Sequence, residues 1–312
     1  MATETGGAAI PWSADRVVKG IALMIFAGIC SSLLHIGVRH VSPYLPSIEI
    51  VALRSLFTLL VTMCAVALTT GMSWRTKRFD LHVIRGIVGV MSMWTWYYAL
   101  GHLPLADAGA LSFTTGLFVT VGAALYFGEK VGPRRWAAVI VGFAGAVIIL
   151  RPGAGIITLA AIWAVLSSAL WGVSLLMAKH LAKFDQSLTI SFYQPLVTAP
   201  IALLLAVPTW VWPEPWVLAV LVGMGMVAAA GNYCYVHALR VADASLVMPA
   251  DYVRLLWMAG WGFLFFAEVP LITTWIGAAL IVGSTAFITW RERRIAAERR
   301  AALAHEKATA GA

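Results

Sequence analysis

The run VVKGIALMIFAGICSSLLHIGV, residues 17–38, decides the class of fold. It has the length of a bilayer-spanning helix, which needs about 20 mostly apolar residues. Its one charged residue, Lys19, lies close to its start. Because every backbone N–H and C=O group inside lipid needs an internal partner, a run of this kind is predicted to be a helix rather than a loop.

Ten such runs follow one another along the 312 residues. The chain is 61% hydrophobic and 12% charged, whereas soluble domains have about 25% charged residues. Connectors such as Leu103-Pro104 leave no room for a soluble domain. We therefore predict an all-α integral membrane protein with ten transmembrane helices. The predicted ranges are 17–38, 46–70, 81–101, 105–127, 133–150, 157–181, 186–208, 215–239, 243–266 and 271–290.

The net charge of +8 is concentrated in short loops and in the C-terminal tail. If the N-terminus is cytoplasmic, the outer loops hold only Arg39 and Arg151, and the other loop lysines and arginines lie inside. This bias predicts a multi-pass protein of the bacterial inner membrane with both termini in the cytoplasm. The same pattern argues for membrane topology and against nucleic-acid binding.

Residues 99–150 align without a gap on residues 238–289. The matches include non-aliphatic positions, such as Trp136 on Trp275. Each half then has five helices, and an odd number reverses the orientation of the second half, giving the inverted repeat of many secondary transporters. The predicted organisation is an N-terminal cytoplasmic segment (1–16), two five-helix repeats (17–150 and 151–290) and a charged cytoplasmic tail (291–312).

Three motifs of the first half recur in modified form in the second. They are Tyr97-Tyr98-Ala99-Leu100 with Ala238-Leu239, Ala106-Asp107-Ala108 with Ala242-Asp243-Ala244, and Phe127-Gly128-Glu129 with Phe266-Ala267-Glu268. With these motifs the chain resembles the EamA-type members of the drug/metabolite transporter superfamily. The resemblance implies a ten-helix carrier with a central cavity between two inverted repeats. Two departures are Ala110, which replaces a proline, and Ala267, which replaces a glycine.

Ionisable residues at membrane depth are costly and are therefore functional candidates. Asp251 and Arg254 lie near the middle of the ninth predicted helix, on one face. They form either an ion pair that fixes helix packing or a substrate or proton site. Their repeat counterparts are Ser112 and Thr115, and inverted symmetry predicts that these four side chains meet at one central point.

Two further arginines lie within predicted helices. Arg54 either attracts an anionic group of the substrate or pairs with Glu49. Arg85, near the inner end of the third helix, is expected to extend to the lipid headgroups. Glu129 and Glu268 end the fourth and ninth helices and are expected to cap helices or to bond between them.

Aromatic and polar side chains cluster in the third, seventh and eighth predicted helices. They line a cavity for flat solutes or belong to the interfacial aromatic belt. A separate set of small residues in the fifth and tenth helices suits close packing, within the bundle or in a dimer, so we leave monomer and homodimer open. The candidates chosen for the cavity are Trp94, Tyr98, Tyr193 and Asn232.

Nucleotide-binding, zinc-protease and nucleophile-elbow motifs do not occur in the sequence. The three cysteines form no CxxC pair, so we expect neither metal nor cofactor, and we expect no enzymatic activity. We predict a secondary carrier for a small organic metabolite, namely an amino acid, a flavin-like vitamin or a carboxylate. Protons are the expected coupling ion, with Asp251 as their relay. The alternative is a non-transporting membrane subunit or receptor.

Overall fold

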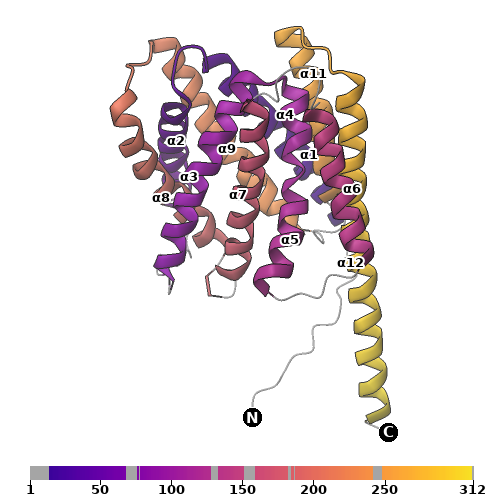
Figure 1. The fold of residues 1–312 in the computed structure, drawn as a ribbon. Coiled ribbons are helices and arrows are strands. Elements are labelled where there is room, and N and C mark those ends of the chain that lie inside the picture. Colours follow the sequence, from indigo (N-terminus) through magenta and orange to yellow (C-terminus); the bar gives the residue numbers. More distant parts are fainter. Residues whose placement is uncertain are drawn as a thin grey trace.

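The computed structural model describes residues 14–67, 76, 78–127, 133–150, 159–181, 184–185, 187–241 and 248–310. Within these residues the regular elements are all helical, which confirms the predicted all-α fold. The helices stand side by side in one bundle (Figure 1). The elements are α1 (Ala14–Val41), α2 (Ser47–Ala67), α3 (Phe79–His102), α4 (Leu105–Ser112), α5 (Thr115–Phe127), α6 (Pro133–Leu150), α7 (Leu159–Leu181), α8 (Ser187–Ala206), η1 (Val207–Thr209), α9 (Pro215–Val241), η2 (Met248–Val253), α11 (Arg254–Phe266) and α12 (Ile272–Ala310).

Among the described residues, six stretches are long and apolar enough to cross a membrane. They lie in α1, α2, α4–α5, α7, α8 and α9, and shorter apolar helices lie in α6 and in the first part of α12. The chain is thus a helical membrane protein, as predicted. The two remaining predicted ranges correspond to α3 and to η2 with α11.

Two of the predicted helices are interrupted near their middle. Between α4 and α5, the amides of Phe113 and Thr114 bond to carbonyls three residues back, which tightens the backbone locally. In the second half, η2 is a 3₁₀ segment that contains Pro249 and leads directly into α11. Neither interruption could be predicted from the hydrophobic runs, because hydropathy depends on composition and not on the backbone hydrogen-bond pattern.

The main packings between helices recur when the two halves are exchanged. α1 packs on α9, and its counterpart α7 packs on α3. α2 packs on both α8 and α9, and α8 packs on both α2 and α3. α4 packs on α11, so the two interrupted segments lie together inside the bundle.

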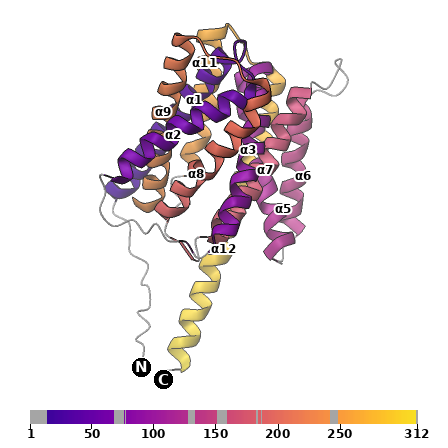
Figure 2. The same ribbon diagram turned by 90° about the vertical axis from the view of Figure 1, so that its left-hand side faces the viewer.

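α6 and α12 lie side by side at one edge of the bundle (Figure 1). Gly145 and Gly277 allow this approach, because a Cβ atom at Gly145 would lie 2.7 Å from the carbonyl oxygen of Gly277, and the reverse distance is 2.5 Å. These small-residue faces therefore pack against each other within one chain. The whole of α12 is one helix of 39 residues, and beyond this contact it extends past the other helices (Figures 1 and 2).

Candidate functional site

The two interrupted segments meet at Arg254, the first residue of α11. Its Nη2 atom donates to the Oγ atom of Ser112, the last residue of α4, over 3.3 Å. The same nitrogen lies 3.6 Å from Oδ2 of Asp251 in η2. The structure therefore brings together three of the four side chains that the repeat predicted to meet. The fourth, Thr115, begins α5 just beyond the interruption.

Arg254 has little else to bond among the described residues. Its guanidinium carbon lies 5.2 Å from the centre of the Phe113 ring, which is a cation–π contact. Its Nε atom is buried and has no hydrogen-bond partner. Tyr235 of α9 is close enough to interact electrostatically with both Asp251 and Arg254. The ion pair thus leaves part of the guanidinium available to a ligand.

The depth of this cluster follows from helix geometry. α11 has 13 residues, so at 1.5 Å per residue Arg254 lies about 18 Å from the far end of the helix. The hydrocarbon core of a bilayer is about 30 Å thick. With the end of α11 at one edge of that core, Arg254 would lie near its middle.

A second arginine, Arg54 of α2, lacks a carboxylate partner among the described residues. Among the described residues its Nη1 atom has one hydrogen-bond partner, the Sδ atom of Met93 at 3.5 Å, and its buried Nε atom has none. Glu49 does not pair with it, because the Glu49 Oε2 atom accepts the amide of Val211 at 3.1 Å. Of the two interpretations of Arg54, the pairing with Glu49 is therefore wrong, and a guanidinium available for a ligand remains.

His35 of α1 is close enough to both arginines to interact with them electrostatically. The indole Nε1–H of Trp96 donates to its Nε2 atom over 3.2 Å. Because Nε2 accepts this bond, the proton of the neutral ring lies on Nδ1. Nδ1 is buried and has no partner among the described residues. His35 therefore offers one more unused donor to the same region.

Within the described residues this region contains two guanidinium groups and the single carboxylate of Asp251. Unpaired buried cations are expensive, and hydrogen bonds to charged donors are about twice as strong as neutral ones. The arrangement thus favours a ligand with negative charge or with several carbonyl-type acceptors. It disfavours a cation.

The remaining sequence candidates lie elsewhere. Trp94 is 39% exposed and points away from the bundle interior. Tyr98 stacks on His102 with ring centres 4.3 Å apart, near the end of α3. Asn232 is exposed on α9, about one turn before Tyr235. Within the described residues, no hydrogen bond or ring contact joins these candidates to Arg54 or Arg254.

His35 and Trp96 also belong to this region, but they are not among the candidates chosen from the sequence. The signal that identifies Trp96 is its spacing of three residues from Met93, which places both on one face of α3. Tyr98 is five residues from Met93 and faces elsewhere. The sequence does not show which face of α3 points inward, so it cannot tell which of its neighbouring aromatic residues line a cavity. These residues are Trp94, Trp96, Tyr97 and Tyr98.

A polar cluster at the N-terminal end of α3 joins the two halves. Asp185 accepts from Thr76 Oγ1 at 2.6 Å, and its Oδ2 atom lies 2.9 Å from Nε2 of His82. Tyr193, predicted for the cavity, instead stacks on His82 with ring centres 4.5 Å apart. Arg85, expected at the headgroups, is buried and donates to the carbonyl of Ile190, so that prediction was wrong. The Arg85 guanidinium bonds to a backbone carbonyl of α8 instead of to a lipid headgroup.

A second polar cluster joins the halves at the C-terminal end of α3. Arg39 forms a 3.1 Å ion pair with Glu268 and donates to the carbonyls of Leu100 and Leu103. The other oxygen of Glu268 accepts the amide of Leu105 at 2.7 Å. Glu268 therefore bonds between helices, as predicted, whereas Glu129 lies outside the described residues.

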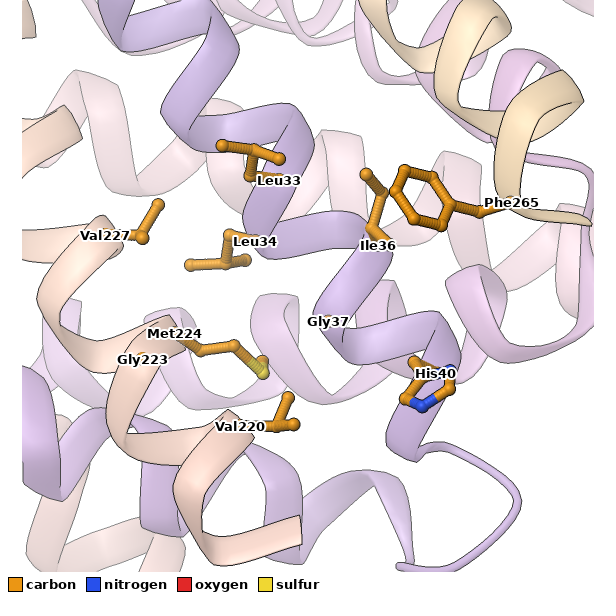
Figure 3. Close-up of a pocket in the computed structure, with 10 residues that line it drawn as sticks. All are labelled: Leu33, Leu34, Ile36, Gly37, His40, Val220, Gly223, Met224, Val227 and Phe265. Atoms are coloured by element: carbon orange, nitrogen blue, oxygen red, sulfur yellow. The ribbon is translucent and has the colours of Figure 1, made fainter. Parts of the chain in front are cut away.

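A depression of about 350 Å³ lies on the apolar surface between α1, α9 and α11 (Figure 3). Figure 3 shows Phe265 directed towards Ile36, with His40 at one end. The residues that line it are apolar apart from His40, and neither Arg54 nor Arg254 is among them. In a bilayer such a surface faces acyl chains, so we do not assign the substrate to it.

Groups of three or more residues able to hold a metal ion are not found in the described part of the chain. Comparison with known proteins then identifies the family. The model of the EamA-like transporter family matches residues 18–151 and 158–290. The chain belongs to this family. The two matches confirm the resemblance to drug/metabolite transporters and the presence of two repeats.

Members of this family in other bacteria align along most of the chain. A riboflavin transporter of Vibrio cholerae serotype O1 is 36% identical, covering 90% of this chain and 97% of the relative. A riboflavin transporter of Rhizobium johnstonii is 34% identical, covering 90% and 94%. An S-adenosylmethionine uptake transporter of Rickettsia prowazekii is 26% identical, covering 89% and 94%. A solved crystal structure shares the fold, with a TM-score of 0.60 at 20% identity over 90% of this chain and 99% of that one.

Proposed function

We propose that the protein carries riboflavin, or a closely related neutral flavin, across the bacterial inner membrane. The observation that carries this proposal is the set of unused N–H donors on Arg54, Arg254 and His35 inside the bundle. The family places the chain among transporters. The riboflavin transporters at 36% and 34% identity are consistent with this substrate class.

A flavin suits this arrangement chemically. Its tricyclic ring is flat and apolar on both faces, and its pyrimidine edge carries two carbonyl oxygens and a ring nitrogen that accept hydrogen bonds. The guanidinium groups of Arg54 and Arg254 supply donors for these acceptors. Trp96 supplies an aromatic surface next to them. The ribityl hydroxyls have Asp251 and Ser112 as partners.

S-adenosylmethionine fits the same site less well. It carries a net positive charge at neutral pH, and the described part of the site has two guanidinium groups to one carboxylate. A unit charge at about 6 Å from an unpaired guanidinium is repelled by about 3 kcal/mol at an effective dielectric constant of about 20. The charges of this site therefore favour a neutral flavin over S-adenosylmethionine, the two substrates named for the relatives.

Alternating access supplies the transport mechanism in this proposal. Ten transmembrane helices form two inverted repeats with both termini in the cytoplasm. The inner cluster around Asp185 and the outer cluster around Glu268 each bond one half to the other, so we propose that they open in turn. A proton gradient drives accumulation, with Asp251 as the group that binds the proton.

The test is riboflavin uptake into proteoliposomes, followed by the intrinsic fluorescence of the vitamin. We expect saturable uptake that amino acids and simple carboxylates do not inhibit. Arg254→Gln and Arg54→Gln should each lower uptake at least tenfold, whereas Arg294→Gln in the extended part of α12 should leave it unchanged. Folded protein that neither binds nor moves riboflavin would refute the proposal and favour a membrane subunit or receptor.

A further inference from the structure

Gln194 of α8 has a side-chain amide without a hydrogen-bond partner among the described residues. Both its Nε2 and Oε1 atoms are buried. A buried amide normally bonds through its donor and its acceptor, and inside a membrane the cost of leaving both unused is greater. A ligand that bonds to both atoms of this amide would explain why they have no partner in the ligand-free protein.

The opposite helix leaves space for this amide. A Cβ atom at Gly89 of α3 would lie 2.9 Å from Nε2 of Gln194 and 3.5 Å from the Thr198 methyl group. Any larger residue at Gly89 therefore displaces the Gln194 side chain. Gly89 allows α3 and α8 to approach while the amide keeps its place.

Gln194 also lies next to the cluster described above. Gly89, Met93 and Trp96 are spaced by four and three residues, so they share one face of α3. Gln194 lies against the first of them, Arg54 against the second and His35 against the third. The step from Gly89 to Met93 is about 6 Å along the helix axis, which is comparable with the edge of one pyrimidine ring.

We propose that Gln194 is a specificity-determining residue that binds the imide edge of the flavin ring. Its Oε1 atom accepts the N3–H group of the ring, and its Nε2 atom donates to an adjacent ring carbonyl. A primary amide presents one donor and one acceptor side by side, and an imide edge presents the complementary pair. Arg54 of α2, which contacts Met93 one turn along α3 from Gly89, donates to the acceptors at the other side of the same edge.

This inference rests on the proposed function and extends it to one edge of one ring. Wild-type protein is titrated with riboflavin and with 3-methylriboflavin, which lacks the N3–H donor, in detergent solution by quenching of flavin fluorescence. We expect N3 methylation to weaken binding by the wild type at least tenfold. Gln194→Leu should bind riboflavin about tenfold more weakly and should no longer distinguish the two flavins.

Two further variants keep the test independent of any damage to folding in Gln194→Leu. Gly89→Ala displaces the amide without removing it and should also lose the discrimination. Thr198→Val retains the methyl group that faces Gly89 and should keep the wild-type ratio. If the wild type binds both flavins equally, or if Gln194→Leu keeps the wild-type ratio, the role of Gln194 is refuted while the carrier function stands. If riboflavin does not bind the wild type at all, both proposals fall.

Discussion

Replacing Arg54 with leucine should have opposite effects on ligand-free stability and on ligand binding. The side chain forms no ion pair among the described residues, and its one hydrogen bond is a weak contact with a thioether. Replacing a buried ion pair by well-packed apolar residues of similar volume is often neutral or stabilising by about 1–4 kcal/mol. For an unpaired charge we expect Arg54→Leu to stabilise the ligand-free protein by about 1–3 kcal/mol.

The loss of binding follows from the same lack of partners. A hydrogen bond to a charged donor contributes about 1.5–3 kcal/mol, and 1.4 kcal/mol corresponds to a factor of ten in affinity. Arg54→Leu should therefore weaken riboflavin binding roughly 10-fold to 150-fold. A purely structural arginine would show neither this loss nor a gain in stability.

Thermal unfolding of purified protein, with and without riboflavin, measures both effects in one assay. Arg39→Met is the matched control, because it breaks the ion pair with Glu268 and two carbonyl hydrogen bonds. It should lower the Tm of the ligand-free protein and leave the Kd for riboflavin near the wild-type value. If Arg54→Leu lowers the ligand-free Tm as much as Arg39→Met does, Arg54 is a packing residue and the site assignment is refuted.

Ala267, with φ of 53°, adopts the left-handed conformation that costs L residues about 1 kcal/mol, so Ala267→Gly should raise the free energy of unfolding by about 0.5–1 kcal/mol, seen as a higher Tm. Gly145→Val places its Cβ against a backbone oxygen and should lower stability by about 1–3 kcal/mol or more; an unchanged Tm would contradict the α6–α12 contact. Asp185→Asn weakens the inner cluster and, in a Cys30→Ala, Cys64→Ser background, should speed labelling of Cys234 from the cytoplasmic side.

Much of the fold was predictable because lipid imposes one strong rule on the backbone. Apolar runs long enough to span a bilayer must be helices, and the repeat then related one half to the other. The same relation predicted that Arg254 and Ser112 meet, since counterpart helices of an inverted repeat cross at the centre. Composition and spacing were sufficient for these conclusions.

The finer features of the site were not predictable, because they depend on which face of each helix points inward. Trp94, Tyr98 and Trp96 looked alike in the sequence, and only Trp96 contacts the arginine cluster through His35. Arg85 found a backbone acceptor on α8, which no pattern within α3 reveals. The interruption at Phe113 arises from local backbone bonds that leave hydropathy unchanged.

The bonding of α3 at both of its ends has a mechanical consequence. The helix has 24 residues, so it is about 36 Å long, with the Asp185 cluster at one end and the Arg39–Glu268 pair at the other. If it tilts by about 10° about its middle, each end moves by about 3 Å, which is the length of a hydrogen bond. In a rigid helix of this length, a tilt that breaks the hydrogen bonds at one end also displaces the bonded residues at the other end. Met93, which contacts Arg54, lies near the middle of α3, so a ligand that bonds to Arg54 binds close to the point about which the two ends would move.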